Sequence, residues 1–158
     1  MKALLIAFVT LLTAPAFAED LTEADRAELQ AVDAAYVSGW LQNGTPAQEA
    51  AIMPLFADDA VIMPGRGLEP RTGMDEIRGF WFPDGYPPTQ VLEFSHDIAG
   101  INGNSHQAVI HGRSFLHFEY NGIERRQGGN YLIVARQHEG EWLISHMIWN
   151  DIIYDDED

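Results

Sequence analysis

The stretch VLEFSHDIAGINGNSHQAVIHGRSFLHFEYNG, residues 91–122, decides the fold class. It predicts two long strands, over 91–101 and 107–120, because β-branched and aromatic residues recur between turn signals. It ends on Asn121-Gly122, a dipeptide typical of a two-residue hairpin turn. Two more predicted strands follow, over 131–137 and 142–153. The second half of the chain is therefore expected to form a long antiparallel meander.

The residues before this meander have helical patterns. Thr22 followed by Asp25 predicts a capped helix start. The apolar residues that come next share one helical stripe: Leu29, Val32, Tyr36 and Trp40. A second helix is predicted over 45–53, with Thr45 as the N-cap, Pro46 in the first position and Gln48 completing a capping box. A short strand over 60–63 and a third helix over 75–82 complete an α+β pattern of three helices packed on one face of a curved antiparallel sheet.

The N-terminus predicts export. Lys2 precedes an apolar run of about a dozen residues, too short for a membrane span of roughly 20, and Ala16-Phe17-Ala18 fits a signal-peptidase site. We therefore expect residues 1–18 to be a cleavable signal peptide and the protein to be periplasmic or secreted. Residues 19–154 are expected to form one domain, followed by an acidic tail over 155–158.

Composition narrows the classes of partner. The chain has 24 acidic residues and 9 basic ones, and Lys2 is its only lysine. No basic face is available for nucleic acid or for an anionic membrane, so neither is expected as a partner after signal cleavage. The absence of cysteine excludes disulfides, thiol nucleophiles and thiolate metal sites. No cofactor motif or metal-ligand cluster was found in the sequence, so neither a cofactor nor a metal is expected.

Several short motifs resemble the superfamily named after nuclear transport factor 2, which includes ketosteroid isomerase and the SnoaL-like cyclases. They are LFADDA (55–60), EPRTG (69–73), FEYNG (118–122) and GEWLI (140–144). The resemblance spans most of residues 22–152 and implies a cone-shaped fold in which the helices cover an apolar pocket. It implies little about the reaction, because such folds host enzymes and binding proteins alike.

The resemblance also implies which side chains line that pocket. These are Tyr36, Trp40, Phe56, Met63 and Trp81 from the helices and the first strand, with Ser114, Leu116 and Phe118 from the long strand. The alternative is that these aromatic residues are core only. A ketosteroid isomerase also needs a carboxylate base, and that position falls on Pro64, beside Met63. Steroid isomerisation is therefore not expected.

Other acid–base groups were considered in its place. Tyr36 matches the isomerase tyrosine, and the second oxyanion donor falls near Asn130 or Tyr131. His146 in the last strand is the favoured base, so the predicted catalytic set is Tyr36, Asn130 and His146. His96 and Asp97 are neighbours along a strand and should therefore point to opposite faces. Asp58 and Asp59 are expected in turn or cap roles.

Three functions remain open from the sequence. The first is a pocket that binds a small hydrophobic or aromatic ligand without assigned chemistry. The second is an isomerase, dehydratase or cyclase that transfers protons on such a ligand. The third is a non-catalytic interaction domain. The strand side that carries His111, Arg113, Phe115 and His117 is expected to form a homodimer through the sheet, because arginine and aromatic residues are enriched at interfaces.

Overall fold

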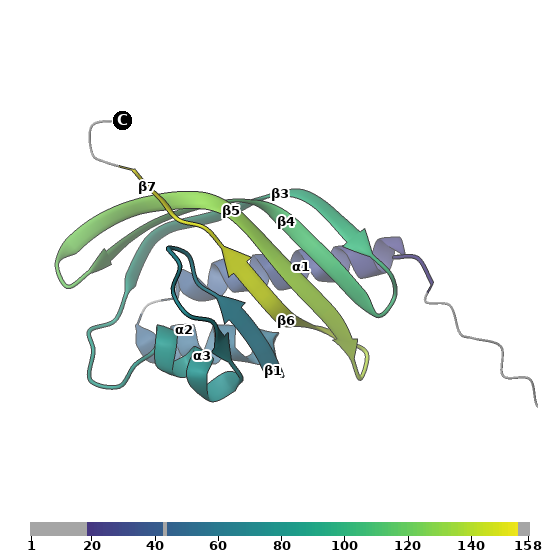
Figure 1. The fold of residues 1–158 in the computed structure, drawn as a ribbon, viewed down its shortest axis with the longest axis horizontal. Coiled ribbons are helices and arrows are strands. Elements are labelled where there is room, and N and C mark those ends of the chain that lie inside the picture. The colour runs from purple at the N-terminus through teal and green to yellow at the C-terminus, as the bar shows by residue number, and fades with distance from the viewer. Residues whose placement is uncertain (1–18, 43, 155–158) are drawn as a thin grey trace, which may run out of the picture.

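The computed structural model describes residues 19–42 and 44–154 and consists of three α-helices against a curved sheet of seven strands (Figure 1). The predicted signal peptide over 1–18 and the acidic tail over 155–158 lie outside the described residues. At its start, Glu19 accepts a hydrogen bond from the Ser105 N–H, and Asp20 bridges to Asn104. In the described part of the chain, no helix is long and apolar enough to span a membrane.

The first helix begins as the sequence predicts. Helix α1 spans Glu23–Trp40, and Thr22 and Asp25 form the reciprocal hydrogen bonds of a capping box. Leu29 and Tyr36 are buried on its inner face. Asp33 is buried on the same face, so the stripe that packs against the sheet carries one carboxylate.

The start of the second helix differs from the prediction. Helix α2 spans Thr45–Ile52, its N-cap is Gly44 rather than Thr45, and no side chain caps it. Gln48 is buried instead, and its amide donates to the carbonyl oxygens of Trp40 and Thr89. It therefore ties the end of α1 to the segment before the long strands. A 3₁₀ helix at Met53–Leu55 follows, where Pro54 cannot continue an α-helix.

The sheet order is β2-β1-β6-β5-β4-β3. Strand β7 pairs with residues 126–128 of β5, beyond the part of β5 that pairs with β6. The bounds are β1 Phe56–Met63, β2 Arg71–Thr72, β3 Gln90–Gly103, β4 Gln107–Tyr120, β5 Ile123–His138, β6 Glu141–Trp149 and β7 Ile152–Tyr154. Helix α3, Met74–Trp81, follows β2. Strand β1 runs parallel to β6, so the sheet is mixed rather than wholly antiparallel as expected. The α+β fold class with three helices on a curved sheet is confirmed.

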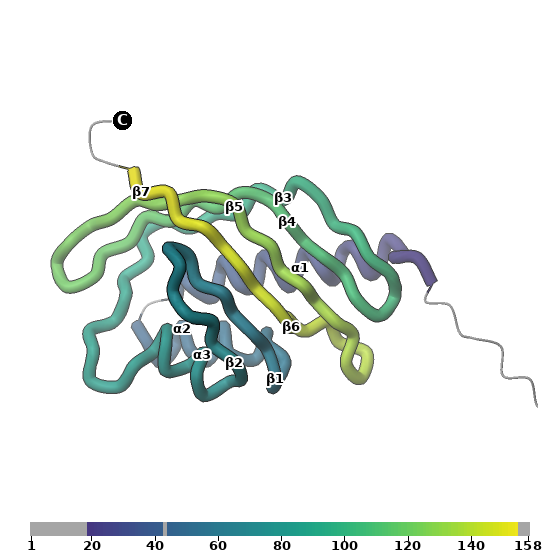
Figure 2. The backbone as a smooth tube through the Cα atoms, viewed as in Figure 1, coloured from purple at the N-terminus to yellow at the C-terminus, as the bar shows by residue number. Residues whose placement is uncertain are grey.

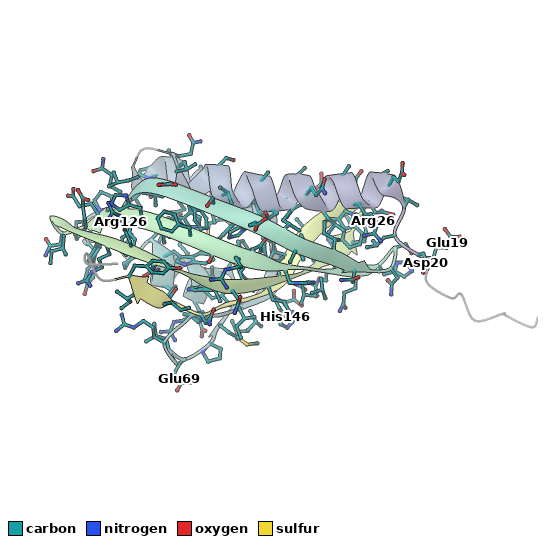
Figure 3. All side chains as sticks on the ribbon, turned by 90° about the horizontal axis from the view of Figure 1, so that it is seen from above. Glu19, Asp20, Arg26, Glu69, Arg126 and His146 are labelled. Atoms are coloured by element: carbon teal, nitrogen blue, oxygen red, sulfur yellow. The ribbon has the colours of Figure 1, made fainter. Side chains whose placement is uncertain are left out.

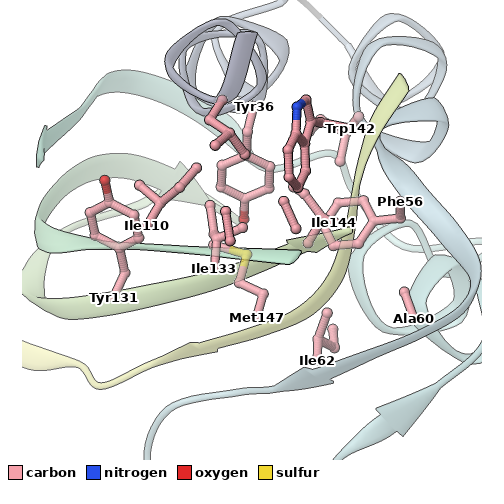
Figure 4. Packing of buried hydrophobic residues seen from close by; sticks show 14 of the residues in the cluster. Tyr36, Phe56, Ala60, Ile62, Ile110, Tyr131, Ile133, Trp142, Ile144 and Met147 are labelled. Atoms are coloured by element: carbon pink, nitrogen blue, oxygen red, sulfur yellow. The ribbon is translucent and has the colours of Figure 1, made fainter. Parts of the chain in front are cut away.

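The hairpin formed by β4 and β5 is strongly curved, as the backbone trace shows (Figure 2). Its turn at Asn121 and Gly122 has positive φ at both residues, the conformation that Asn-Gly favours. The core lies between α1 and the sheet, where Tyr36, Ile110, Ile133 and other apolar side chains meet (Figure 4). The sheet therefore has a concave face covered by helices and a convex face without them.

A β-bulge in β6 decides which residues reach the concave face. Opposite β5, Val134 pairs with His146 and Ala135 pairs with Ile144, so Ser145 is the extra residue. Its hydroxyl donates to the Val134 carbonyl oxygen over 3.0 Å. Before the bulge Ile144 points inward, and after it Met147 does, which leaves His146 exposed. Simple alternation along this apolar strand could not have given that pattern.

Candidate functional site

A cavity of about 280 Å³ lies between the helices and the concave face of the sheet. Tyr36 and Trp40 of α1 and Trp81 of α3 line its helical side. The sheet contributes Ser114, Leu116 and Phe118 of β4 together with several residues of its other strands. The wall is rich in aromatic rings, since Tyr36 alone has ring neighbours at 5.9–6.3 Å in Trp40, Phe56, Trp81, Phe94 and His96. The cavity therefore has the size and lining of a site for a small aromatic or apolar molecule.

Of the eight residues that the sequence places around a pocket, six line this cavity: Tyr36, Trp40, Trp81, Ser114, Leu116 and Phe118. Phe56 lies behind the wall, buried in the core with its ring 5.4 Å from that of Trp81. Met63 ends β1 with 37% of its surface exposed and is not part of the lining. Its turn outward follows from the parallel pairing of β1 with β6, in which Met63 lies opposite the outward-facing Ile148.

The structure does not bring together the three residues predicted as a catalytic set. Tyr36 lines the cavity, but His146 is exposed on the convex side, away from α1 (Figure 3). Asn130 is also exposed, in a shallow groove on that same face. Tyr131, the neighbour that the sequence left as an alternative, lines the cavity instead. The grouping of His146 and Asn130 with Tyr36 is therefore wrong in geometry, because of the bulge in β6 and the register of β5.

A histidine that sequence reasoning set aside occupies the cavity wall. His96 of β3 and Asp33 of α1 are joined by a hydrogen bond of 2.8 Å between Nδ1 and Oδ1. Their side chains are 2% and 5% exposed. With Asp33 accepting from Nδ1–H, the neutral ring keeps Nε2 as its proton acceptor. Nε2 has no hydrogen-bond partner among the described residues. A buried carboxylate thus fixes the tautomer of an imidazole that lines an apolar cavity.

Tyr131 of β5 stacks on this imidazole. The ring centroids of Tyr131 and His96 are 3.7 Å apart and their planes differ by 17°. The Tyr131 hydroxyl is buried and has no hydrogen-bond partner within the described part of the chain. Burial, with the negative charge of Asp33 in addition, raises the pKa of Tyr131 above its usual range. The hydroxyl, drawn with the core residues in Figure 4, therefore stays protonated and can donate a hydrogen bond.

The sequence held a signal for this pair that neighbour patterns do not reveal. Asp97, the acid beside His96, is exposed, whereas the true partner lies 63 residues earlier in the chain. Asp33 falls four residues after Leu29 and three before Tyr36, on the apolar stripe of α1. An acid on a buried helical stripe needs a partner inside the protein, and that need is the signal.

One acid, Asp151, lines the cavity from the segment between β6 and β7. Burial raises the pKa of Asp151, and the Arg66 guanidinium and the Trp149 indole offset part of that rise. Pro64, on which the sequence places the isomerase base position, also lines the cavity, and its side chain accepts no proton. In residues 19–42 and 44–154, no three His, Asp or Glu side chains are arranged to hold a metal ion.

The paired acids in β1 have other surroundings. Asp58 and Asp59 lie within the strand rather than at its end, and both are exposed. Asp59 pairs with Arg136 of β5, and this ion pair lowers the pKa of Asp59. Their predicted place in a turn or cap is therefore wrong, since the strand begins at Phe56.

No protein-family model matches the chain, and no curated protein matches it. Solved structures do. A ketosteroid isomerase-like protein from Erwinia carotovora atroseptica aligns over 83% of this chain and 98% of its own, with 16% identity and a TM-score of 0.68. A candidate scytalone dehydratase from Novosphingobium aromaticivorans aligns over 85% and 89%, with 15% identity and a TM-score of 0.67.

A further solved structure carries the fold name itself. A nuclear transport factor 2-like protein of unknown function from Shewanella oneidensis aligns over 80% of this chain and 98% of its own, with 16% identity and a TM-score of 0.57. Identities this low establish architecture and leave the reaction open. The chain has the cone-shaped α+β fold of the nuclear transport factor 2-like proteins.

Proposed function

We propose that this protein binds a small aromatic or apolar molecule in its cavity and that His96 abstracts a proton from a carbon atom of that molecule. The observation that carries the proposal is the buried Asp33–His96 pair, whose imidazole lines the cavity. Burying two polar side chains of this kind is costly unless they are paired. A core does not need such a pair, whereas a general base does.

The chemistry follows from the hydrogen bonds. Asp33 accepts the Nδ1 proton of His96, so Nε2 is free to take a proton from the ligand. The carboxylate then stabilises the imidazolium that forms. If the carbon lies beside a carbonyl group, the electron pair moves onto the carbonyl oxygen. The Tyr131 hydroxyl, neutral and otherwise unpartnered among the described residues, is the donor for that oxygen.

Two fates of the proton are compatible with this site. Its return to another carbon would complete an isomerisation, and the loss of a leaving group would complete an elimination. The names of the ketosteroid isomerase-like and scytalone dehydratase-like neighbours fall within this range of reactions. Steroid isomerisation itself is not proposed, because Pro64 replaces the base that such an enzyme uses.

The test separates binding from chemistry. The protein from Glu19 onward is first screened by thermal shift against aromatic ketones, phenols, terpenoids and arylalkylamines. A ligand present at 100 times its dissociation constant stabilises the protein by about 2.7 kcal/mol. Compounds that bind in this screen are then incubated with the protein in D₂O. NMR follows the replacement of their carbon-bound hydrogen by deuterium.

We expect deuterium incorporation with the unmodified protein and its loss, by about 100-fold or more, in His96→Gln. The matched control is His111→Gln, because His111 lies on the convex face of β4. Exchange that persists in His96→Gln would exclude His96 as the base. Binding without exchange in any bound ligand would leave a binding protein and remove the catalytic part of the proposal.

We also propose that the protein works outside the cytoplasm after cleavage between Ala18 and Glu19. The support is the apolar run after Lys2 and the Ala16-Phe17-Ala18 motif. Expression of the full chain in a Gram-negative host, followed by mass measurement of the periplasmic product, tests this. Recovery of the protein only from the cytoplasm, with residues 1–18 intact, would contradict it.

A further inference from the structure

Asp151 is held in the cavity wall by the close approach of three chain segments. The chain passes against β5 just before it, where a side chain at Gly129 would collide with the Asn150 backbone. On the other side, a side chain at Gly65 would lie 2.8 Å from the Asp151 carboxyl carbon. Two glycines therefore make room for this carboxylate in the cavity wall.

The carboxylate lies at the same level of the cone as His96. His96 pairs with Ser114 across β3 and β4, and Ser114 pairs with Gly129 across β4 and β5. The chain at Asn150 is next in this row. Strands lie about 4.8 Å apart, so the row crosses roughly 14 Å along a curved sheet. One ligand of moderate size can therefore contact both His96 and Asp151.

Asp151 has no charge partner of its own. It forms no ion pair with any described residue, and the guanidinium of Arg66 lies beyond ion-pair distance. Among the described residues that line the cavity, Asp151 is the sole acid, and none is a lysine or an arginine. Burial of a carboxylate without an ion pair is unfavourable, and it raises the pKa of Asp151 although the Arg66 charge and the Trp149 indole oppose the rise. A positively charged ligand would supply the missing partner, and a negatively charged one would be repelled.

The aromatic rings beside Asp151 also favour a positively charged ligand. Three of the four tryptophans of the chain line the cavity: Trp40, Trp81 and Trp149. Trp149 is two residues from Asp151 and stacks on Trp81, with centroids 6.2 Å apart and planes 24° apart. Tryptophan faces attract ammonium groups within about 6 Å, and aromatic walls with a carboxylate are a known way to hold such cations.

We infer that the ligand of this cavity carries an ammonium group, held by the Asp151 carboxylate and by the faces of Trp149 and Trp81. The inference names the ligand class of the proposed function and therefore rests on it. Within that function, the ammonium end binds at Asp151 while the apolar body reaches His96. Net negative charge over the whole chain adds a favourable field for cations.

The pH dependence follows from the groups that face the ammonium end. Asp151 must be ionised to hold the cation, so the affinity should rise with pH through the pKa of Asp151. Other charged or titratable groups near the cavity are Arg66 in the β1–β2 loop, Arg71 of β2, Asp33 and Tyr36 of α1, His96 of β3, Tyr131 of β5 and Tyr154 of β7. Burial raises the pKa of Tyr36 and of Tyr131 and keeps both neutral. Asp151→Asn should therefore remove this rise of affinity with pH.

The experiment uses three ligands with one indole ring and different charge: tryptamine, tryptophol and indole-3-acetate. Their binding to the protein from Glu19 onward is measured by calorimetry at several pH values. We expect tryptamine to bind at least about tenfold more tightly than tryptophol, because a hydrogen bond between charged groups is stronger than one from a neutral hydroxyl. Indole-3-acetate should bind more weakly than both.

Asp151→Asn should remove the preference for tryptamine over tryptophol, and Asp58→Asn should retain it. Asp58 is exposed on β1 outside the cavity, so this control removes the same charge without touching the site. Equal binding of tryptamine and tryptophol, or an unchanged preference in Asp151→Asn, would overturn the inference. Failure of tryptamine and of every other amine in the thermal-shift panel to bind would overturn it as well. Binding and exchange of neutral ligands alone would leave the proposed function standing while removing this inference.

Discussion

The same strands form the concave and the convex face of the sheet, but the two faces carry different side chains and differ in burial. In β4, Ser114, Leu116 and Phe118 line the cavity, whereas Arg113 and His111 lie in the shallow groove on the other face. The concave face is packed by helices and aromatic rings, and the convex face is covered by no helix of the described structure. The difference shows that alternation along a strand decides which polar groups can take part in chemistry.

The histidines of the two faces differ in the same way. His96 is buried on the concave face with a carboxylate partner, while His146 is exposed on the convex face beside Ser145. His117 also lies outward and bonds to the exposed Glu124. All three are histidines in long strands, and only the fold distinguishes them. A neutral imidazole becomes a credible base only where burial and a fixed partner occur together.

The largest expected effect is on stability, between two neighbours in β5. Ile133 is fully buried on the concave face opposite Ile110, whereas Leu132 is half-buried in the convex groove. Ile133→Ala should lower the free energy of unfolding by about 2–5 kcal/mol. Leu132→Ala should lower it by about 1 kcal/mol or less. Urea unfolding of both variants gives the comparison, and equal losses would show that the two faces are not packed differently.

A homodimer through the convex face is the next prediction. Ile148 is 44% exposed there, in the groove with Ala99, Leu132 and Arg113. If a second copy covers this groove, Ile148→Asp should weaken self-association by more than about tenfold, because it buries a charge at the centre of the interface. Light scattering at micromolar concentration measures this. Ile123→Asp at the distant hairpin tip is the control, and a wild-type monomer would contradict the prediction.

Much of the fold could be predicted because strong local signals agreed with it. The strand at Gln107–Tyr120 and the turn at Asn121-Gly122 were found at their observed positions. The start of β5 was missed by eight residues, since IERRQGGN (123–130) has little strand propensity and is held by pairing with β4. Tertiary pairing there overrides local preference.

The site was less predictable for a different physical reason. The pocket aromatics follow from helical and strand periodicity, so most of them could be named. The Asp33–His96 pair depends on a contact between α1 and β3, and the outward turn of His146 depends on one extra residue in β6. Both depend on how distant segments align with each other, and the residue pattern within a single segment carries no information about that alignment.

A smaller effect concerns the buried hydroxyl of Tyr131. Because it has no partner among the described residues, Tyr131→Phe should leave the free energy of unfolding unchanged or raise it by up to about 1 kcal/mol. The same variant should weaken the binding of ligands that carry an acceptor oxygen. Urea unfolding with and without such a ligand tests both signs. A clear loss of stability in the free protein would mean that the hydroxyl already has a partner.

The smallest predicted effect is on the pH dependence of stability, to which two aspartates contribute with opposite sign. One lies in the cavity wall and the other is exposed on β1. Burial raises the pKa of Asp151, so the folded state holds its proton more tightly than the unfolded state does. Stability should therefore fall as pH rises from the ordinary aspartate pKa of about 3.9 through the raised pKa of Asp151. The hydrogen bond from Arg136 lowers the pKa of Asp59, so its contribution is present above about pH 3.9 and is lost as pH falls through the lowered pKa.

Unfolding measurements across this range for Asp151→Asn and Asp59→Asn separate the two contributions. Asp151→Asn should remove a loss of stability that the unmodified protein shows on going from acid to neutral pH, and Asp59→Asn should remove a gain. The Asp59 effect should also shrink with added salt, because that ion pair is exposed to solvent and the Asp151 carboxylate is partly shielded. If both variants changed the pH profile in the same direction, the cavity wall and the exposed strand would not differ in polarity as the two faces of this sheet require.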